Sequence, residues 1–186
     1  MAKGKYDKYI MSGMRPWNRR ASGPIVAYWD DQVNRKAYKG SHQYYIHWVG
    51  LKPEGLEGVE TWEQMGHGPH EHTYPEVVMH LGTDPFNPLD LGAEVEFCLG
   101  PEKEKHILTT SDAVYLPANF IHGPWIIRKV TRPFIIVTVE QWPIHMEKSH
   151  KEMVSAKERE NLLFIDQGYK NGERIVKLAK KMSGEW

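Results

Sequence analysis

The sequence predicts an all-β fold, either a sandwich or a barrel. Proline and glycine interrupt the middle of the 186-residue chain at roughly ten-residue intervals. The segments between these breaks are short and rich in residues that favour extended strands. Within residues 93–99, small or apolar residues alternate with Glu94 and Glu96, which is the two-residue period of a half-exposed strand.

The strands can be placed in order between the breaks. A tight turn at residues 66–69 leads into an extended stretch that carries His70 and His72. Residues 25–29 are equally compatible with a turn or a helix, and residues 117–124 form a turn that carries His122. The expected strands are residues 25–29, 44–49, 59–65, 76–81, 93–99, 105–108, 113–116, 125–130 and 134–141.

Both ends of the chain differ from this middle part in composition and in the secondary structure that they predict. Residues 1–24 are polar and irregular and predict an N-terminal arm, so the barrel itself is expected to span residues 25–143. Residues 144–186 predict a C-terminal helical extension. Its first helix would cover residues 147–164 with Ser149 as cap and Glu152 as its box partner, and its second would cover residues 171–182. These helices would pack on the barrel or on a second subunit.

Charge and cysteine content exclude several classes of protein. Lys plus Arg and Asp plus Glu number 24 each, so the formal net charge is zero. We therefore expect no nucleic-acid partner and no membrane surface as partner. The single cysteine, Cys98, cannot form an intramolecular disulfide, and no apolar run approaches the length of a membrane span or a signal peptide. We expect a soluble, cytoplasmic protein.

Four residues form a candidate metal site. His70 and His72 are one residue apart, a spacing that points both imidazoles to one face of a strand. Glu76 follows after a Tyr74-Pro75 bend, and His122 comes from a distant turn. Three imidazole nitrogens and one carboxylate oxygen suit Fe, Mn, Ni, Co, Cu or Zn better than Ca or Mg. Four protein ligands leave two positions open on an octahedral ion, as a catalytic metal requires.

The same residues carry a resemblance to a known family. The stretch from His70 to Glu76 resembles the first motif of the cupins, and residues 117–122 resemble the second, with Asn119 in place of its glycine. Asn tolerates a left-handed turn better than other non-glycine residues. The resemblance, over residues 60–142, implies a cupin-type double-stranded β-barrel (jelly roll), in which His70, His72, Glu76 and His122 bind one divalent transition metal. It also implies a homodimer by family analogy.

Three further residues are candidates for a catalytic role. Glu94 and Glu96 share one strand face, which is either a solvated face or places one of them in the barrel as a proton shuttle. His80 lies four residues after Glu76 and would share its face. His67 lies in a turn and is expected at the surface or beside the metal ligands. The aromatic residues are expected mostly in the core, with several lining the barrel mouth.

These observations predict a metal-dependent enzyme that acts on a small organic molecule, aromatic or carboxylate-bearing. With Fe(II) we expect a dioxygenase-like reaction, as in many cupins. With Zn, Mn or Ni the metal would act as a Lewis acid, in a lyase, isomerase, decarboxylase or hydrolase. A third alternative is a small-ligand binding module without turnover.

Overall fold

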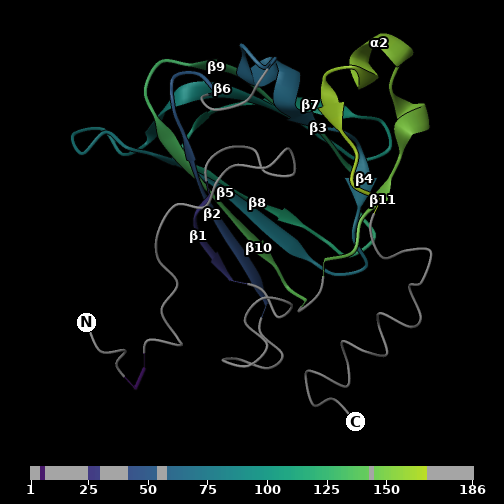
Figure 1. Ribbon diagram of the computed structural model, residues 1–186, viewed down its shortest axis with the longest axis horizontal. Coiled ribbons are helices and arrows are strands. Elements are labelled where there is room, and N and C mark those ends of the chain that lie inside the picture. Colours follow the sequence, from purple (N-terminus) through teal and green to yellow (C-terminus); the bar gives the residue numbers. More distant parts are fainter. Residues whose placement is uncertain (1–4, 7–24, 30–41, 54–57, 143–144, 167–186) are drawn as a thin grey trace.

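Two β-sheets face each other in the computed structural model, which describes residues 5–6, 25–29, 42–53, 58–142 and 145–166 (Figure 1). The first sheet has five strands, which are antiparallel wherever they pair. In spatial order they are β1 (Ile25–Trp29), β2 (Gln43–Val49), β10 (Phe134–Glu140), β5 (Glu76–Gly82) and β8 (Asp112–Leu116).

The second sheet contains seven strands, several of them only two residues long. Its long strands are β6, β7 and β9, and β6 pairs with both of the others. Only the pairing of β12 with β3 is parallel among its described pairs. The strands are β3 (Gly66–His67), β4 (His70–Glu71), β6 (Asp90–Leu99), β7 (Glu104–Thr110), β9 (His122–Val130), β11 (Lys148–Ser149) and β12 (Leu162–Leu163).

The core lies between the sheets because the strands alternate inward and outward residues. In β5, Glu76, Val78 and His80 are buried, while the residues between them are more exposed. Apolar side chains from both sheets, with Trp62, meet in one cluster. It comprises Val49, Trp62, Val78, Leu91, Ala93, Val95, Phe97, Leu116, Trp125, Ile127, Phe134 and Ile136. This arrangement confirms the predicted double-stranded barrel.

One expected strand is replaced by a helical turn. Within residues 59–65, Trp62–Met65 form the 3-10 helix η2. The Gln64 side-chain oxygen accepts hydrogen bonds from the backbone N–H groups of Glu60 and Thr61, at 2.7 and 3.0 Å. This capping box stabilises the start of the turn, a local signal that the alternation of apolar residues does not reveal.

The continuous helix predicted for residues 147–164 is wrong. The segment contains the strands β11 and β12, and between them the 3-10 helix η3 (Lys151–Met153) and the short helix α2 (Ala156–Arg159). β11 pairs with β4, and β12 pairs with β3, so both add to the second sheet at the right of Figure 1. Tertiary pairing therefore outweighs local helix propensity in this segment.

The capping box in this segment also differs from the prediction. Ser155 and Glu158, rather than Ser149 and Glu152, form it at the start of α2. The Ser149 backbone N–H instead donates to the Asp166 carboxylate at 2.9 Å. The predicted helix at residues 171–182 lies outside the described residues, as does most of the predicted arm at residues 1–24.

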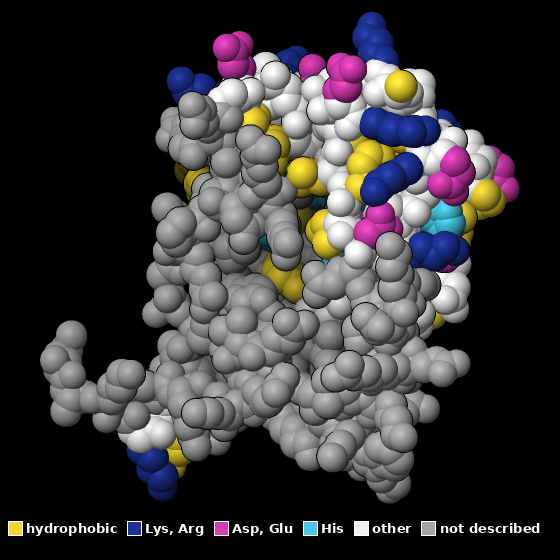
Figure 2. Space-filling model, turned by 45° about the vertical axis from the view of Figure 1, so that its right-hand side comes forward, with side chains coloured by type: hydrophobic (Ala, Val, Ile, Leu, Met, Phe, Trp, Pro, Cys, Tyr) yellow, Lys and Arg dark blue, Asp and Glu magenta, His cyan; other side chains and the backbone are white. Residues whose placement is uncertain are grey.

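Among the described residues, no helix is both long enough and apolar enough to span a membrane. Figure 2 shows Lys and Arg side chains close to Asp and Glu side chains over the described part of one face. This mixture is consistent with the zero net charge of the sequence.

Candidate metal centre

The four predicted metal ligands meet inside the barrel, and both sheets contribute to them. His70 lies in β4 and pairs directly with His122, the first residue of β9. His72 follows β4, and Glu76 is the first residue of β5 in the other sheet. The Tyr74-Pro75 bend thus carries the chain from one sheet to the other between His72 and Glu76.

The two motifs are joined through their backbones. The Asn119 N–H donates to the His72 carbonyl oxygen at 2.6 Å. Asn119 adopts the left-handed conformation with φ 60°, as expected for the residue in place of the motif's glycine. Gly123 has φ 94°, and a Cβ atom there would lie 2.7 Å from the Gly68 carbonyl oxygen. A glycine is therefore required where β9 approaches the turn before His70.

One ligand atom from each residue lies within 4.8 Å of the others. Glu76 Oε2 is 3.5 Å from His72 Nε2 and 3.3 Å from His122 Nε2. The ring centroid of His70 is 4.1 Å from that of His122 and 5.0 Å from that of His72. Metal–ligand bonds of about 2.0–2.2 Å separate adjacent ligand atoms by roughly 3 Å, so these distances suit a shared ion.

Backbone carbonyl groups fix the orientation of all three imidazoles. The Nδ1 atoms of His70, His72 and His122 lie 2.7, 2.7 and 2.9 Å from the carbonyl oxygens of Gly68, Met146 and Phe120. A carbonyl oxygen can only accept, so each Nδ1 must carry the proton and donate it. The neutral form of each ring therefore has its lone pair on Nε2, the tautomer that a metal ligand needs.

Burial and neighbouring charges shift the titration of the site. All four residues are buried, and none is more than 6% exposed. Burial lowers the pKa of His70 well below its ordinary value, and the neighbouring His67 and His122 lower it further. Burial alone would raise the pKa of Glu76, but His72 and His122 together hold it well below the usual range. Glu76 is thus an ionised carboxylate beside an uncharged His70.

These features fit a transition-metal ion. His122 Nε2 is buried without a hydrogen-bond partner, although the Glu76 carboxylate is nearby. An orphaned buried nitrogen is costly unless something else binds it. The buried cluster of three histidines and one glutamate is consistent with a single divalent transition-metal ion, and the donor set does not select one metal among the candidates.

A hydrogen-bonded group of polar side chains around Glu140 lies beside His72 and was not predicted from the sequence. Glu140 Oε2 accepts hydrogen bonds from Tyr74 Oη at 2.6 Å and from Gln43 Nε2 at 2.8 Å, and His145 Nδ1 lies 2.9 Å from Oε1. Glu140 pairs with Glu76 in the sheet register. The sequence did contain one signal. Glu140 is an even number of residues from Phe134 and Ile136, so its side chain projects to the same buried face of the strand, where a charged residue is unusual.

Glu94 and Glu96 face away from the metal cluster. Their neighbours Val95 and Phe97 belong to the core, so the alternation of β6 turns both carboxylates outward. Glu94 is half exposed and lies 3.5 Å from Lys129. Glu96 is covered by Arg128 and Lys105, at 3.1 and 3.0 Å. A solvated, ion-paired face thus describes Glu94, whereas Glu96 is buried beneath its ion-pair partners. Arg128 and Lys129 form ion pairs with these two carboxylates.

His80 is buried but has both ring nitrogens occupied. Trp125 Nε1 donates to His80 Nε2 at 3.0 Å, so Nε2 carries the lone pair. His80 Nδ1 therefore carries the proton and donates to Asp112 Oδ1 at 2.8 Å. This arrangement links β5, β8 and β9 through a neutral imidazole and leaves no ring nitrogen free for the metal cluster.

Some of the aromatic residues expected in the core or at the barrel mouth lie instead on the outer surface. Trp62, Trp125 and Phe134 are in the core, as expected. Tyr44 and Tyr115 are exposed on the outer face of the first sheet, because their positions in β2 and β8 alternate with buried ones. They do not line the barrel interior. The aromatic rings nearest to the ligands belong to other residues: Tyr74 stacks on His72 at 5.2 Å, and Phe97 lies 6.2 Å from His122.

Comparisons with known proteins find similarity only at the level of the fold. No family model and no curated protein sequence matches the chain. A double-stranded β-helix protein from Klebsiella pneumoniae matches with a TM-score of 0.42 and 14% identity, over 81% of this chain and 99% of that one. A recombinant oxalate oxidase matches with a TM-score of 0.48 and 10% identity, over 77% and 64%.

The DMSP lyase DddQ from Ruegeria pomeroyi matches with a TM-score of 0.35 and 19% identity. That match covers 59% of this chain and 43% of the lyase, so the chain aligns with less than half of that protein. The topology of the chain itself is two facing β-sheets, one of five and one of seven strands.

Proposed function

We propose that the chain is a metal-dependent enzyme for a small organic substrate, with His70, His72, Glu76 and His122 as the ligands of one divalent transition metal. The observation that carries the proposal is the orientation of the imidazoles. Three backbone carbonyl groups hold the Nδ1 atoms, which leaves Nε2 of each ring as the metal-binding atom, and Nε2 of His72 and of His122 lies close to the Glu76 carboxylate.

The reaction we propose first is an oxygenation. A bound metal supplies a Lewis-acid centre with open coordination positions and, as Fe(II), a centre for oxygen chemistry. The protein's own contribution is to hold the ligands rigidly and to exclude water from them. Phe97 and Met146 are buried beside the ligands, and the face in Figure 2 has a hollow bordered by hydrophobic side chains.

A Lewis-acid lyase or isomerase reaction is the second candidate, and the groups around Glu140 favour it. Tyr74, Glu140 and His145 form a hydrogen-bonded chain beside His72, with a ring-to-ring distance of 5.6 Å between His145 and His72. Phenol, carboxylate and imidazole are the groups that enzymes use to hold and move protons. An oxygenation has less need of such a chain.

The test loads metal-free protein separately with Fe(II) and with Zn(II). Each form is incubated with a panel of small aromatic and carboxylic compounds, while oxygen uptake and product formation are measured. Oxygen uptake that needs Fe(II) and one of the compounds supports the oxygenase. Turnover by the Zn(II) form without oxygen uptake supports the second candidate and overturns the first.

Two matched variants test whether turnover depends on the metal site. Glu76→Gln is expected to abolish turnover because it removes the charged ligand. Glu94→Gln, on the exposed face, is expected to leave turnover unchanged. Stoichiometric metal binding without turnover of any compound would overturn the enzyme proposal in favour of a binding module. Localisation, a homodimeric state and the absence of a nucleic-acid or membrane partner remain predictions from the sequence.

A further inference from the structure

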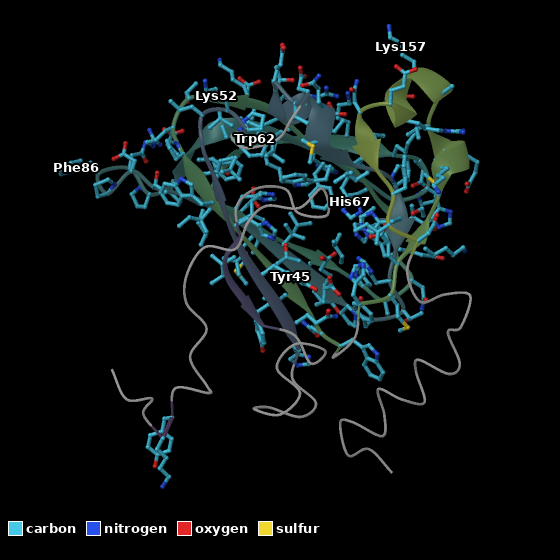
Figure 3. The ribbon with its side chains drawn as sticks, in the orientation of Figure 1. Tyr45, Lys52, Trp62, His67, Phe86 and Lys157 are labelled. Atoms are coloured by element: carbon cyan, nitrogen blue, oxygen red, sulfur yellow. The ribbon has the colours of Figure 1, made fainter. Side chains whose placement is uncertain are left out.

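A second group of buried ligand atoms lies next to the first. One ligand atom from each of His67, His70 and Glu147 lies within 4.8 Å of the other two. The ring of His67 stacks on that of His70 with a centroid distance of 4.1 Å and an interplanar angle of 19°. His67 lies on the side of the barrel where β4 and β11 run (Figures 1 and 3).

Two imidazole nitrogens lie near the Glu147 carboxylate. Glu147 Oε2 is 3.1 Å from His67 Nε2 and 3.6 Å from His145 Nε2, both within ion-pair distance. All three atoms are buried, and none of them has a hydrogen-bond partner of good geometry. Ligand atoms around one ion at bond lengths of about 2.0–2.2 Å would be separated by similar distances, roughly 3–3.5 Å.

The rest of the protein holds the Glu147 carboxylate in place. Its side chain is completely buried, and its Oε1 accepts a hydrogen bond from the Ile165 backbone N–H at 3.1 Å. Ser149 Oγ lies 3.4 Å from the same oxygen. Oε2 is therefore the oxygen left to face His67 and His145. His145 is itself held through Nδ1 by Glu140, an arrangement typical of histidines beside metal ions.

We propose that His67, His70 and Glu147 form a second position for a divalent transition-metal ion, with His145 beside it. The two positions share His70, whose Nδ1 is bound to the Gly68 carbonyl and which has only Nε2 to offer. When His70 binds the first ion, the second retains His67, Glu147 and solvent. The second ion therefore binds more weakly than the first, by about tenfold or more.

The second position is also closer to solvent than the first. His67 is 23% exposed, whereas the four ligands of the first site are nearly inaccessible. An ion arriving from solution can therefore reach His67 before it reaches His72 or His122. The proposal concerns metal stoichiometry and does not depend on whether the first ion supports turnover.

The experiment titrates the metal-free full-length chain with Co(II), followed by its visible absorbance and by equilibrium dialysis. The unsubstituted protein is expected to bind two equivalents, one tight and one about tenfold weaker or more. His67→Gln and Glu147→Gln are each expected to lose the weaker equivalent and keep the tight one. A double variant, Glu76→Gln with His122→Gln, is expected to lose the tight one and still bind one equivalent.

Controls distinguish this result from misfolding and from adventitious binding. His106→Gln changes an exposed histidine of β7 and is expected to retain both equivalents. Because Glu147 is fully buried, the partly exposed His67 provides the variant that is expected to fold, as checked by thermal unfolding. Binding of a single equivalent by the unsubstituted protein, or two equivalents in both His67→Gln and Glu147→Gln, overturns the proposal and leaves Glu147 in ion pairs with His67 and His145.

Discussion

The His72 Nδ1–H donates to the Met146 carbonyl oxygen at 2.7 Å, across a separation of 74 residues in the chain. Tyr74 holds the same peptide segment, because its hydroxyl accepts from the Met146 N–H at 2.9 Å and donates to Glu140. The orientation of one metal ligand thus depends on the segment between β10 and β11. This relationship makes Tyr74 a positioning residue for His72.

Tyr74→Phe tests this role. Removal of the hydroxyl leaves the Met146 N–H and a Glu140 oxygen without that partner, and is expected to cost about 1–3 kcal/mol of unfolding free energy. Loosening of His72 is expected to weaken the tight Co(II) equivalent by about tenfold. Urea unfolding and Co(II) titration measure the two effects. Tyr115→Phe, at an exposed position, is the control, and equal metal affinity in both variants would contradict the positioning role.

Gly123→Ala is expected to disturb the approach of β9 to the turn before His70. Gly123 and Gly58 both have positive φ, 94° and 74°, but only at Gly123 would a Cβ meet backbone, at 2.7 Å from the Gly68 oxygen. Gly58→Ala is therefore expected to cost about 1 kcal/mol from backbone strain alone, and Gly123→Ala considerably more. Thermal unfolding of the two variants is the measurement. Equal melting temperatures would show that the contact with Gly68 is unimportant.

Phe97→Ala is expected to destabilise the barrel strongly. Phe97 is 2% exposed and fills the space beside His122 and His80. Truncation of such a residue leaves a cavity and costs about 3–5 kcal/mol. Phe86→Ala provides a matched control, because Phe86 is 95% exposed and its truncation is expected to change stability by less than about 0.5 kcal/mol. Urea denaturation of both variants tests the difference.

His80→Ala is expected to separate stability from metal binding. The substitution leaves Trp125 Nε1 and Asp112 without their shared partner and creates a cavity, so a loss of about 2–4 kcal/mol is expected. Co(II) affinity is expected to change by less than about threefold, because neither ring nitrogen serves the metal cluster. A large loss of affinity in a variant that is still folded would restore His80 as a candidate for the site.

The metal-free protein is expected to lose stability in acid. Burial would raise the pKa values of Glu76 and Glu147, but the neighbouring histidines outweigh it and lower both values below the ordinary 4.5. Below about pH 4.5 the unfolded chain therefore binds more protons than the folded chain, so the unfolding free energy falls as the pH decreases. Each of these groups contributes up to about 1.4 kcal/mol per pH unit.

Urea unfolding of metal-free protein between pH 3 and pH 6, a range of roughly one unit or more on either side of that value, measures this dependence. Glu147→Gln is expected to reduce the slope by the contribution of one carboxyl group, whereas Glu94→Gln serves as the exposed control. An unchanged slope in Glu147→Gln would show that the Glu147 carboxyl group has the same affinity for protons in the folded and unfolded chains.

The sequence by itself predicted most of the strands between residues 25 and 142 and the four residues of the metal cluster. Alternation along β5 and β6 places Val78 and Val95 in the core because side chains of a strand project to opposite faces. The one-residue spacing of His70 and His72 and the turn at Asn119 are local features, so they could be interpreted without coordinates. The left-handed conformation of Asn119 agrees with its place at the glycine position of the motif that residues 117–122 resemble.

Only the tertiary structure decided which distant groups surround these residues. The carbonyl group of Met146, the carboxylates of Glu140 and Glu147 and the ring of His145 reach the site through strand register and loop return, neither of which has a local sequence signal. The same physical reason explains the error at residues 147–164, where pairing of β11 and β12 with the second sheet supplies the backbone hydrogen bonds that a helix would otherwise provide.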